Sequence, residues 1–144
     1  MRDLLLIANL AGQRIAIPAG DVESVVELEG LTPVPRAAAH VAGLSALRSR
    51  VLTVIDCFAS LELGQSDPKD LREAIVVAVD GHPYALSVES VEDVVETDGE
   101  VRPLRTPLAP GWRRVARGMV EAEGDLLLLI DVRALIEGPA VEAA

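Results

Sequence analysis

The chain has 144 residues, half of them hydrophobic, and its 23 acidic and 13 basic side chains give a formal net charge of −10. This length fits one ordinary domain, and the apolar content is too high for a chain that stays disordered. The negative charge disfavours nucleic acid and anionic membranes as main partners, because the field of the protein repels polyanions, and no apolar run approaches the roughly 20 residues that span a bilayer.

Short strands separated by turn residues follow one another through the first half of the chain. The pattern of apolar and β-branched residues predicts strands at residues 4–10, 13–17, 22–28, 43–47 and 51–55. Ala11-Gly12 joins the first two strands as a hairpin. Asp56 follows the last one and is a good N-cap for a short helix that reaches residue 61, because its carboxylate can accept a backbone N–H.

The second half repeats this order after an exposed polar link at residues 64–70. Strands are predicted at residues 74–79, 82–87, 91–96, 118–122 and 126–130. Asp80-Gly81 suits a tight turn because both residues tolerate positive φ. Asp131 then caps a second short helix, to residue 136, as Asp56 does in the first half.

The two halves also match residue by residue, which predicts one domain over residues 1–144 with repeated halves at about 3–63 and 72–137. Residues 12–17 match 81–86 and residues 21–27 match 90–96 at an offset of 69, whereas residues 53–56 match 128–131 at an offset of 75. Six extra residues around 97–110 account for the change in offset. Ten short strands in two equivalent halves predict an all-β fold of two small barrels side by side.

Few residues of the chain are suited to catalysis or to binding a metal or cofactor. We therefore expect no catalytic activity, no metal site and no cofactor. His40 lies in an apolar stretch and Cys57 follows a predicted strand, so both are expected to pack rather than to react. Asp56 and Asp131 are the one tempting carboxylate pair, and a glycosidase needs two carboxyls roughly 5–10 Å apart. The repeat gives each half one of them at the same position, so we expect caps in separate lobes.

Residues 35–56 resemble the signature of the CheW-like family, the adaptor domain of bacterial chemotaxis arrays. A proline-led stretch ends at Gly43, Leu47-Arg48 stands at the Leu-Arg pair of the signature, and the apolar strand after it ends at Asp56. The resemblance covers nearly the whole chain, including the duplication. It implies two pseudo-symmetric five-stranded SH3-like β-barrels with short helices, and some exchange of strands between the lobes.

The resemblance further implies a non-enzymatic adaptor that works in the cytoplasm through two protein partners. One is the regulatory domain of a CheA-type histidine kinase, and the other is the helical cytoplasmic tip of methyl-accepting receptors, held in a hydrophobic groove between the lobes. The receptor contact implied by the family is Arg48, with Leu44, Leu47 and Arg50 as neighbours at the groove. Alternation along the strand sends some of these side chains into the barrel instead. No cofactor, nucleic-acid binding or membrane insertion is expected.

The chain also departs from the signature. Ala46 stands where the family has asparagine, Ser49 where it has glycine and Thr53 where proline is common. One alternative is therefore a divergent scaffold that docks on a kinase or another partner without binding conventional receptors. Another is a small β-barrel module that binds a ligand or nucleic acid, and a third is an enzyme that uses Asp56 or Asp131.

A basic segment at residues 102–117 stands out in this acidic chain, with five arginines and no acidic residue. In one interpretation, Arg113, Arg114, Arg117 and Trp112 form a second interface for an acidic partner surface. In the other, the arginines pair with carboxylates of the chain itself, and Trp112 packs inside a lobe.

Overall fold

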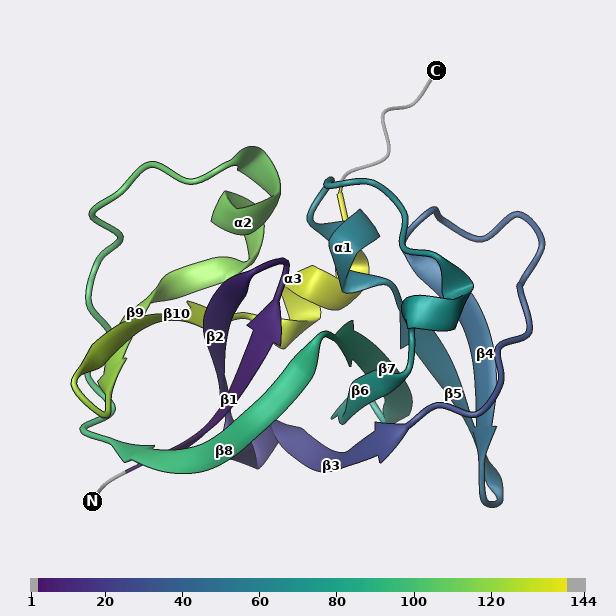
Figure 1. The fold of residues 1–144 in the computed structure, drawn as a ribbon, viewed down its shortest axis with the longest axis horizontal. Helices are drawn as coiled ribbons and strands as arrows, with labels where there is room; N and C mark the ends of the chain where they lie inside the picture. Colours follow the sequence, from purple (N-terminus) through teal and green to yellow (C-terminus); the bar gives the residue numbers. More distant parts are fainter. Residues whose placement is uncertain (1–2, 140–144) are drawn as a thin grey trace.

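The computed structural model describes residues 3–139, which form ten strands, three short α-helices and two 3₁₀ turns (Figure 1). In chain order these are β1 (Asp3–Leu10), β2 (Gln13–Pro18), η1 (Ala19–Asp21), β3 (Val22–Glu27), β4 (Val41–Leu47), β5 (Arg50–Ile55), α1 (Cys57–Ser60), η2 (Pro68–Asp70), β6 (Glu73–Val79), β7 (His82–Val88), β8 (Ser90–Thr97), α2 (Pro110–Val115), β9 (Ala116–Ala122), β10 (Asp125–Ile130) and α3 (Val132–Glu137).

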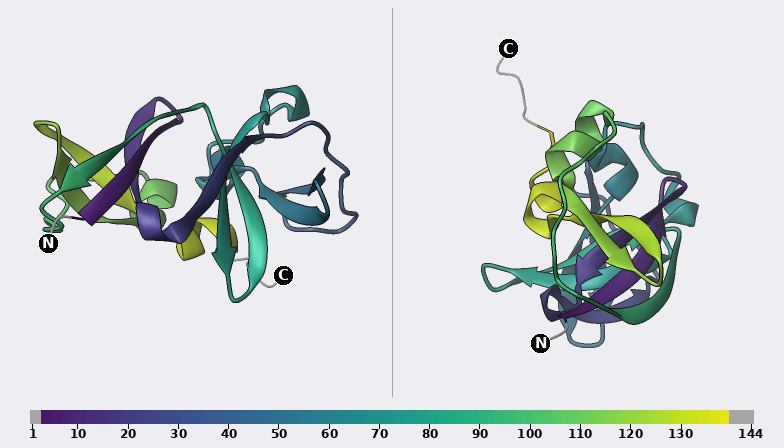
Figure 2. Two further views of the ribbon diagram at one scale, coloured as in Figure 1. Left: turned by 90° about the horizontal axis from the view of Figure 1, so that it is seen from below. Right: turned by 90° about the vertical axis from the view of Figure 1, so that its left-hand side faces the viewer.

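The strands form two five-stranded sheets, as the resemblance implies, and each sheet takes strands from both halves of the chain. The first sheet has the order β8-β1-β2-β10-β9 and the second has the order β3-β6-β7-β5-β4. The chain therefore crosses from the first sheet to the second between β2 and β3 and returns between β7 and β8. The two sheets lie side by side along the long axis of the molecule (Figure 2).

The crossovers create one parallel strand pair in each sheet, and these pairs are equivalent in the repeat. In the first sheet β10 runs parallel to β2, with Leu128 opposite Ile15. In the second sheet β5 runs parallel to β7, with Thr53 opposite Tyr84. The sequence predicts the hairpins but not these parallel contacts, because parallel partners lie far apart in the chain and no turn connects them directly.

Tight turns set the register of the hairpins. Ala11-Gly12, Asp80-Gly81 and Glu123-Gly124 each have positive φ at both residues, as a type I′ turn requires. The right-handed twist of the flanking strands favours this turn type. The sequence prediction of a turn at Ala11-Gly12 and at Asp80-Gly81 is confirmed.

The largest of the three hydrophobic cores lies between the two sheets. Among residues 3–139 this intersheet core contains 17 buried residues, against 7 inside the first sheet and 5 inside the second. In β2, Ile15 and Ile17 belong to the intersheet core and Ala16 to the core of the first sheet, as the alternation of a strand requires. Each sheet therefore buries one of its apolar faces against the other sheet, so the two barrels are not independent units.

The capped helices meet between the two sheets, with α1 above α3 in Figure 1. Asp56 accepts backbone N–H groups of Phe58 and Ala59 at the start of α1. Asp131 does the same for Ala134 at the start of α3. Both predicted N-caps are confirmed, and α1 of one repeat packs against α3 of the other.

Most of the extra residues of the second half lie after Arg102. An isolated bridge joins Thr32 to Leu44 in the first half, and Arg102 to Met119 in the second. The offset between equivalent residues is thus 70 at Arg102, and it has reached 75 by Ala116, which pairs with Ile130 as Val41 pairs with Ile55. The inserted residues build the segment that contains α2, which has no counterpart helix in the first half.

Cys57 is buried at the start of α1, and we expect its thiol to be unreactive in the folded protein. Burial is the main cause that raises its pKa to about 12, so the nucleophilic thiolate is scarce at neutral pH. A thiol reagent such as 5,5′-dithiobis(2-nitrobenzoic acid) at pH 8 should label Cys57 only as fast as the protein unfolds. Rapid stoichiometric labelling of the native protein would contradict this prediction.

Candidate functional site

The hairpin between β4 and β5 carries the arginine that the sequence singled out. Leu47 pairs with Arg50, so Arg48 and Ser49 form a two-residue turn, and both are exposed. Arg48 has a φ of 58°, whereas Ser49 is not in the positive-φ region. The hairpin thus forms without the asparagine and glycine of the family signature, and it holds the Arg48 side chain at its tip.

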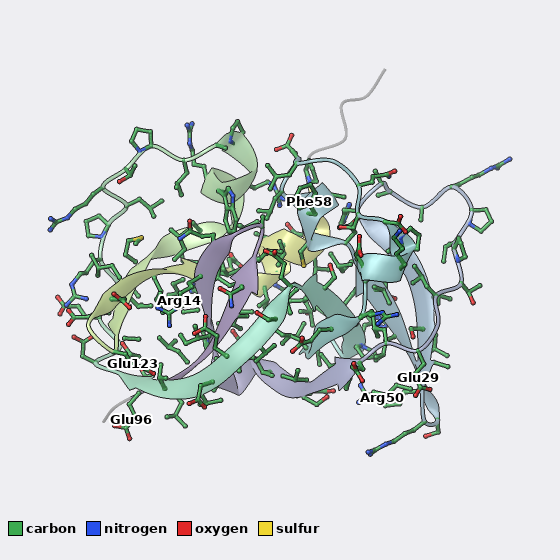
Figure 3. The ribbon with its side chains drawn as sticks, in the orientation of Figure 1. Arg14, Glu29, Arg50, Phe58, Glu96 and Glu123 are labelled. Carbon is green, nitrogen blue, oxygen red and sulfur yellow. The ribbon has the colours of Figure 1, made fainter. Side chains whose placement is uncertain are left out.

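The three neighbours of Arg48 have different environments. Leu47 packs against the core of the second sheet. Leu44 is half-buried, and its backbone exchanges two hydrogen bonds of 2.8 Å with Thr32. The Arg50 guanidinium, labelled in Figure 3, donates a 3.0 Å hydrogen bond to the Glu23 carboxylate on β3, and the two side chains are 49% and 38% exposed. Arg48 and the outer side of Leu44 therefore remain open to a partner, while Leu47 serves the fold.

Two exposed valines lie on the strands by which the chain enters each sheet. Val25 on β3 is 43% exposed and Val94 on β8 is 48% exposed. They are equivalent residues, separated by the repeat offset of 69. Both strands run along the lower edge of the molecule in Figure 1. We call Val25 and Val94 the valine pair.

The valine pair continues the intersheet core out to the surface. Val25 pairs with Ile75 and Val94 pairs with Leu6, and both of these partners are buried in the intersheet core. Residues opposite each other on neighbouring strands share a face, so both valines lie at the solvent margin of that core. The sequence pattern alone did not single them out, although Val25-Val26 and Val94-Val95 are equivalent pairs of adjacent valines, a signal that could have been followed because only one of each pair can face the same side of a strand.

The basic segment divides into arginines that the fold uses and arginines that it leaves exposed. Arg102 lies 3.4 Å from the Glu121 carboxylate and 3.6 Å from that of Asp98. Arg114 is half-buried and donates hydrogen bonds to the carbonyl and hydroxyl of Ser60 on α1 and to the carbonyl of Ala134 on α3. Arg102 thus makes the carboxylate pairs expected by the second interpretation, whereas Arg114 is held by carbonyl and hydroxyl oxygens of α1 and α3 instead.

The remaining residues of the proposed second interface lie more openly. Arg113 and Arg117 are exposed, and Arg113 donates only to the carbonyl of Leu108, at 3.2 Å, within the described part of the chain. Trp112 is half-buried and packs against the intersheet core. A partner at this surface would contact Arg113 and Arg117, whereas the half-buried Arg114 would contribute its positive charge without being fully accessible.

The acidic residues show the geometry of caps. Asp56 is buried, and besides its helix contacts it accepts two hydrogen bonds of 2.8 Å from the N–H and hydroxyl of Ser66. Asp131 follows β10 of the first sheet, whereas Asp56 follows β5 of the second. Within residues 3–139 no group of three His, Cys, Asp or Glu side chains is arranged to hold a metal ion.

His40 packs as expected. Its Nε2 lies 2.7 Å from the carbonyl oxygen of Ile136, and a Cβ on Gly138 would overlap the His40 ring.

None of the helices described is long and apolar enough to cross a membrane.

Comparison with known proteins gives consistent matches along the chain. The sequence model of the CheW-like domain family matches residues 4–140. A chemotaxis protein CheW of Rhizobium meliloti is 29% identical, with 96% of each chain covered. A probable chemotaxis protein CheW of Rhizobium etli is 32% identical, with 90% of each covered. The fold is similar to that of the scaffolding protein TtCheW from Thermoanaerobacter tengcongensis, with a TM-score of 0.79, 23% identity and coverage of 95% of this chain and 94% of the other.

Proposed function

The chain belongs to the CheW-like domain family, and on this premise we propose that it is a non-catalytic chemotaxis adaptor that binds a receptor and a kinase in the cytoplasm. The receptor partner is the helical cytoplasmic tip of a methyl-accepting chemoreceptor. The kinase partner is the regulatory domain of a CheA-type histidine kinase. Coupling then consists of holding the two proteins together.

The valine pair is the observation that carries the receptor half of this proposal. It offers two exposed apolar side chains at the margin between the two sheets, where the resemblance implies a groove for a helix. Binding a helix in a groove draws its affinity from apolar area, and a charged residue at the rim orients the helix. Arg48 supplies that charge from the tip of the β4–β5 hairpin.

Residues of the basic segment support a separate kinase contact. Arg113 and Arg117 are exposed cations on a chain with a net charge of −10, so they form a local patch that can attract a carboxylate-bearing surface. Trp112 precedes Arg113 on α2 and packs against the intersheet core, so binding there would be coupled to the packing of α2. We place the kinase at this second interface.

Calorimetric titration with a receptor-tip fragment and, separately, with a kinase regulatory domain tests the proposal. Val94→Asp should weaken binding of the receptor tip by about 30-fold, the loss typical of a hot-spot residue, because it places a charge in an apolar contact. Arg48→Glu should weaken it by about tenfold. Both variants should keep their affinity for the kinase domain.

Two matched substitutions serve as controls. Leu126→Asp introduces the same charge at a strand residue that is 50% exposed, outside the valine pair. Arg36→Glu reverses the charge of another exposed arginine with positive φ. If the controls weaken receptor binding as much as the test variants do, the site assignment is wrong. Wild-type binding to the kinase but not to the receptor would favour the divergent scaffold.

A further inference from the structure

The repeat contains two equivalent junctions, in each of which a hairpin turn of one sheet meets the capped helix that follows the other sheet. In one junction the turn residue is Asp80 and the helix residue is Arg133. In the other junction the equivalent residues are Ala11, at the offset of 69, and Phe58, at the offset of 75. The duplicated chain thus provides an internal comparison of the same position with two different chemistries.

An ion pair closes the first junction. The Arg133 guanidinium donates hydrogen bonds of 3.0 and 3.2 Å to the two carboxylate oxygens of Asp80. This contact links the β6–β7 hairpin of the second sheet to α3, which follows the first sheet. A bidentate pair of this kind fixes both side chains in one geometry.

The second junction has no such pair, and a cavity of about 490 Å³ lies there instead. Ala11 is too short to reach across, and the Phe58 ring on α1 is half-buried (Figure 3). The other apolar lining residues are Leu10, Leu63, Leu71 and Val88, of which Leu63 is 39% exposed. We call this space, with its lining residues, the Phe58 cavity.

The rim of the Phe58 cavity is acidic. Asp70 and Glu89 line it, and no Lys, Arg or His is among its lining residues. Glu89 uses one carboxylate oxygen to accept the backbone N–H of Gly12 at 2.7 Å, which holds the turn. The Asp70 carboxylate is exposed and accepts no hydrogen bond from any residue of the described range 3–139. The cavity therefore offers an apolar interior beside unneutralised negative charge.

We propose that the Phe58 cavity is a docking site for a peptide segment of a partner protein that inserts an apolar side chain and carries a lysine or arginine beside it. The apolar side chain replaces water against Leu63 and Phe58, and the cation meets Asp70 and Glu89 at the rim. The Phe58 ring face also favours a cation above it. A volume of about 490 Å³ is within the usual range for binding sites and holds side chains rather than a whole helix.

This site is separate in place from the surface assigned to the receptor, and it differs in charge from the surface assigned to the kinase. The valine pair lies on strands at the lower edge of Figure 1, whereas α1, which carries Phe58, lies at the upper edge. The peptide expected in the Phe58 cavity is basic, whereas the partner surface expected at Arg113 and Arg117 is acidic. The proposal therefore stands or falls independently of the proposed function.

The proposal is tested with a transplant variant, which introduces the ion pair of the first junction into the second junction. The double variant Ala11→Asp/Phe58→Arg places the Asp80–Arg133 pair in the second junction. Ala11 has a φ of 51° and Asp80 a φ of 52°, and aspartate tolerates this region better than alanine, so the turn should be kept. The reverse change, Asp80→Ala/Arg133→Phe, is the matched control at the other junction.

The probe is a random peptide library displayed on phage, selected on the wild-type protein and on both double variants. We expect peptides with an apolar residue next to lysine or arginine to be enriched on the wild type and on the control, but not on Ala11→Asp/Phe58→Arg. A synthetic peptide of the enriched sequence should bind the transplant variant at least about tenfold more weakly by fluorescence polarisation, and rising salt should weaken its binding to the wild type.

Circular dichroism melting shows whether the transplant variant is folded. If it is not, the single variant Asp70→Lys gives the same answer, because it changes an exposed side chain and should reduce binding of the basic peptide by about tenfold. Equal enrichment on wild type and transplant, enrichment of peptides without a basic residue, or no enrichment on the wild type would each overturn the proposal.

Discussion

Replacing Arg114 with methionine is expected to lower the free energy of unfolding by about 3 kcal/mol, because a buried carbonyl then loses its charged donor. Arg114 donates to the carbonyl and hydroxyl of Ser60 on α1 and to the carbonyl of Ala134 on α3, so one side chain connects three helices. Ser60 is fully buried, and its carbonyl has no route to water. Urea denaturation followed by circular dichroism measures the change.

The neighbouring arginine is the control for this substitution. Arg113→Met removes the same charge from the same helix, but the Arg113 side chain is exposed and, among residues 3–139, bonds only to the carbonyl of Leu108. We expect its effect to stay within about 0.5 kcal/mol, as for most surface changes. Equal losses for the two variants would mean that the charge of the basic segment, and not the contacts of Arg114, determines stability.

Gly111→Ala is expected to cost about 3 kcal/mol or more, although alanine is the better helix former. Gly111 lies at the start of α2, against the backbone of Leu61 directly after α1, and a Cβ would overlap the Leu61 carbonyl group. Because the neighbour is backbone, it cannot move aside by changing rotamer. One of the two segments must shift, which disturbs the contacts of Arg114 as well.

Gly20→Ala is the matched control, since nothing lies within 4 Å of a Cβ placed there and its φ is not positive. Its melting temperature should change by a few degrees at most, whereas that of Gly111→Ala should fall by about 10 °C or more for a chain of this size. A Gly111→Ala protein as stable as the Gly20→Ala protein would show that α2 does not pack closely against the end of α1.

The strands could be predicted from the sequence because each is short, alternating and bounded by turn residues. The dipeptides Ala11-Gly12 and Asp80-Gly81 gave two of the hairpins, and the aspartates after β5 and β10 gave the start of two helices. These signals are local. A turn or a cap is specified by residues within a few positions of each other, so the information is all in one stretch of sequence.

The association of the sheets could not be predicted in this way. The parallel contact of β2 with β10 joins residues more than 100 positions apart, and no local pattern encodes it. The same holds for Arg114, whose partners are on α1 and α3. The sequence places it among four other arginines of similar surroundings, and only the packing of α2 separates it from Arg113.

The candidate receptor site was predicted in part. The resemblance singled out Arg48, which the hairpin turn exposes, and Leu47, which packs into the second sheet instead. The exposure of Val25 and Val94 was not predicted, because the sequence of these strands fits a pattern in which either face could be buried. Their exposure follows from the edge positions of β3 and β8 in their sheets, a property of topology.

The exchange of strands between the sheets has a consequence for how the protein is made on the ribosome. All strands of the second sheet lie between residues 22 and 88, so they emerge together and can pair at once. The β1–β2 hairpin emerges first but is completed last, because its parallel partner β10 begins at residue 125. At the usual rates of synthesis the hairpin waits roughly 5 to 20 s for that strand. The middle of the chain is therefore the first part able to fold, and the side of the N-terminal strands that packs against β9 and β10 stays uncovered during that interval.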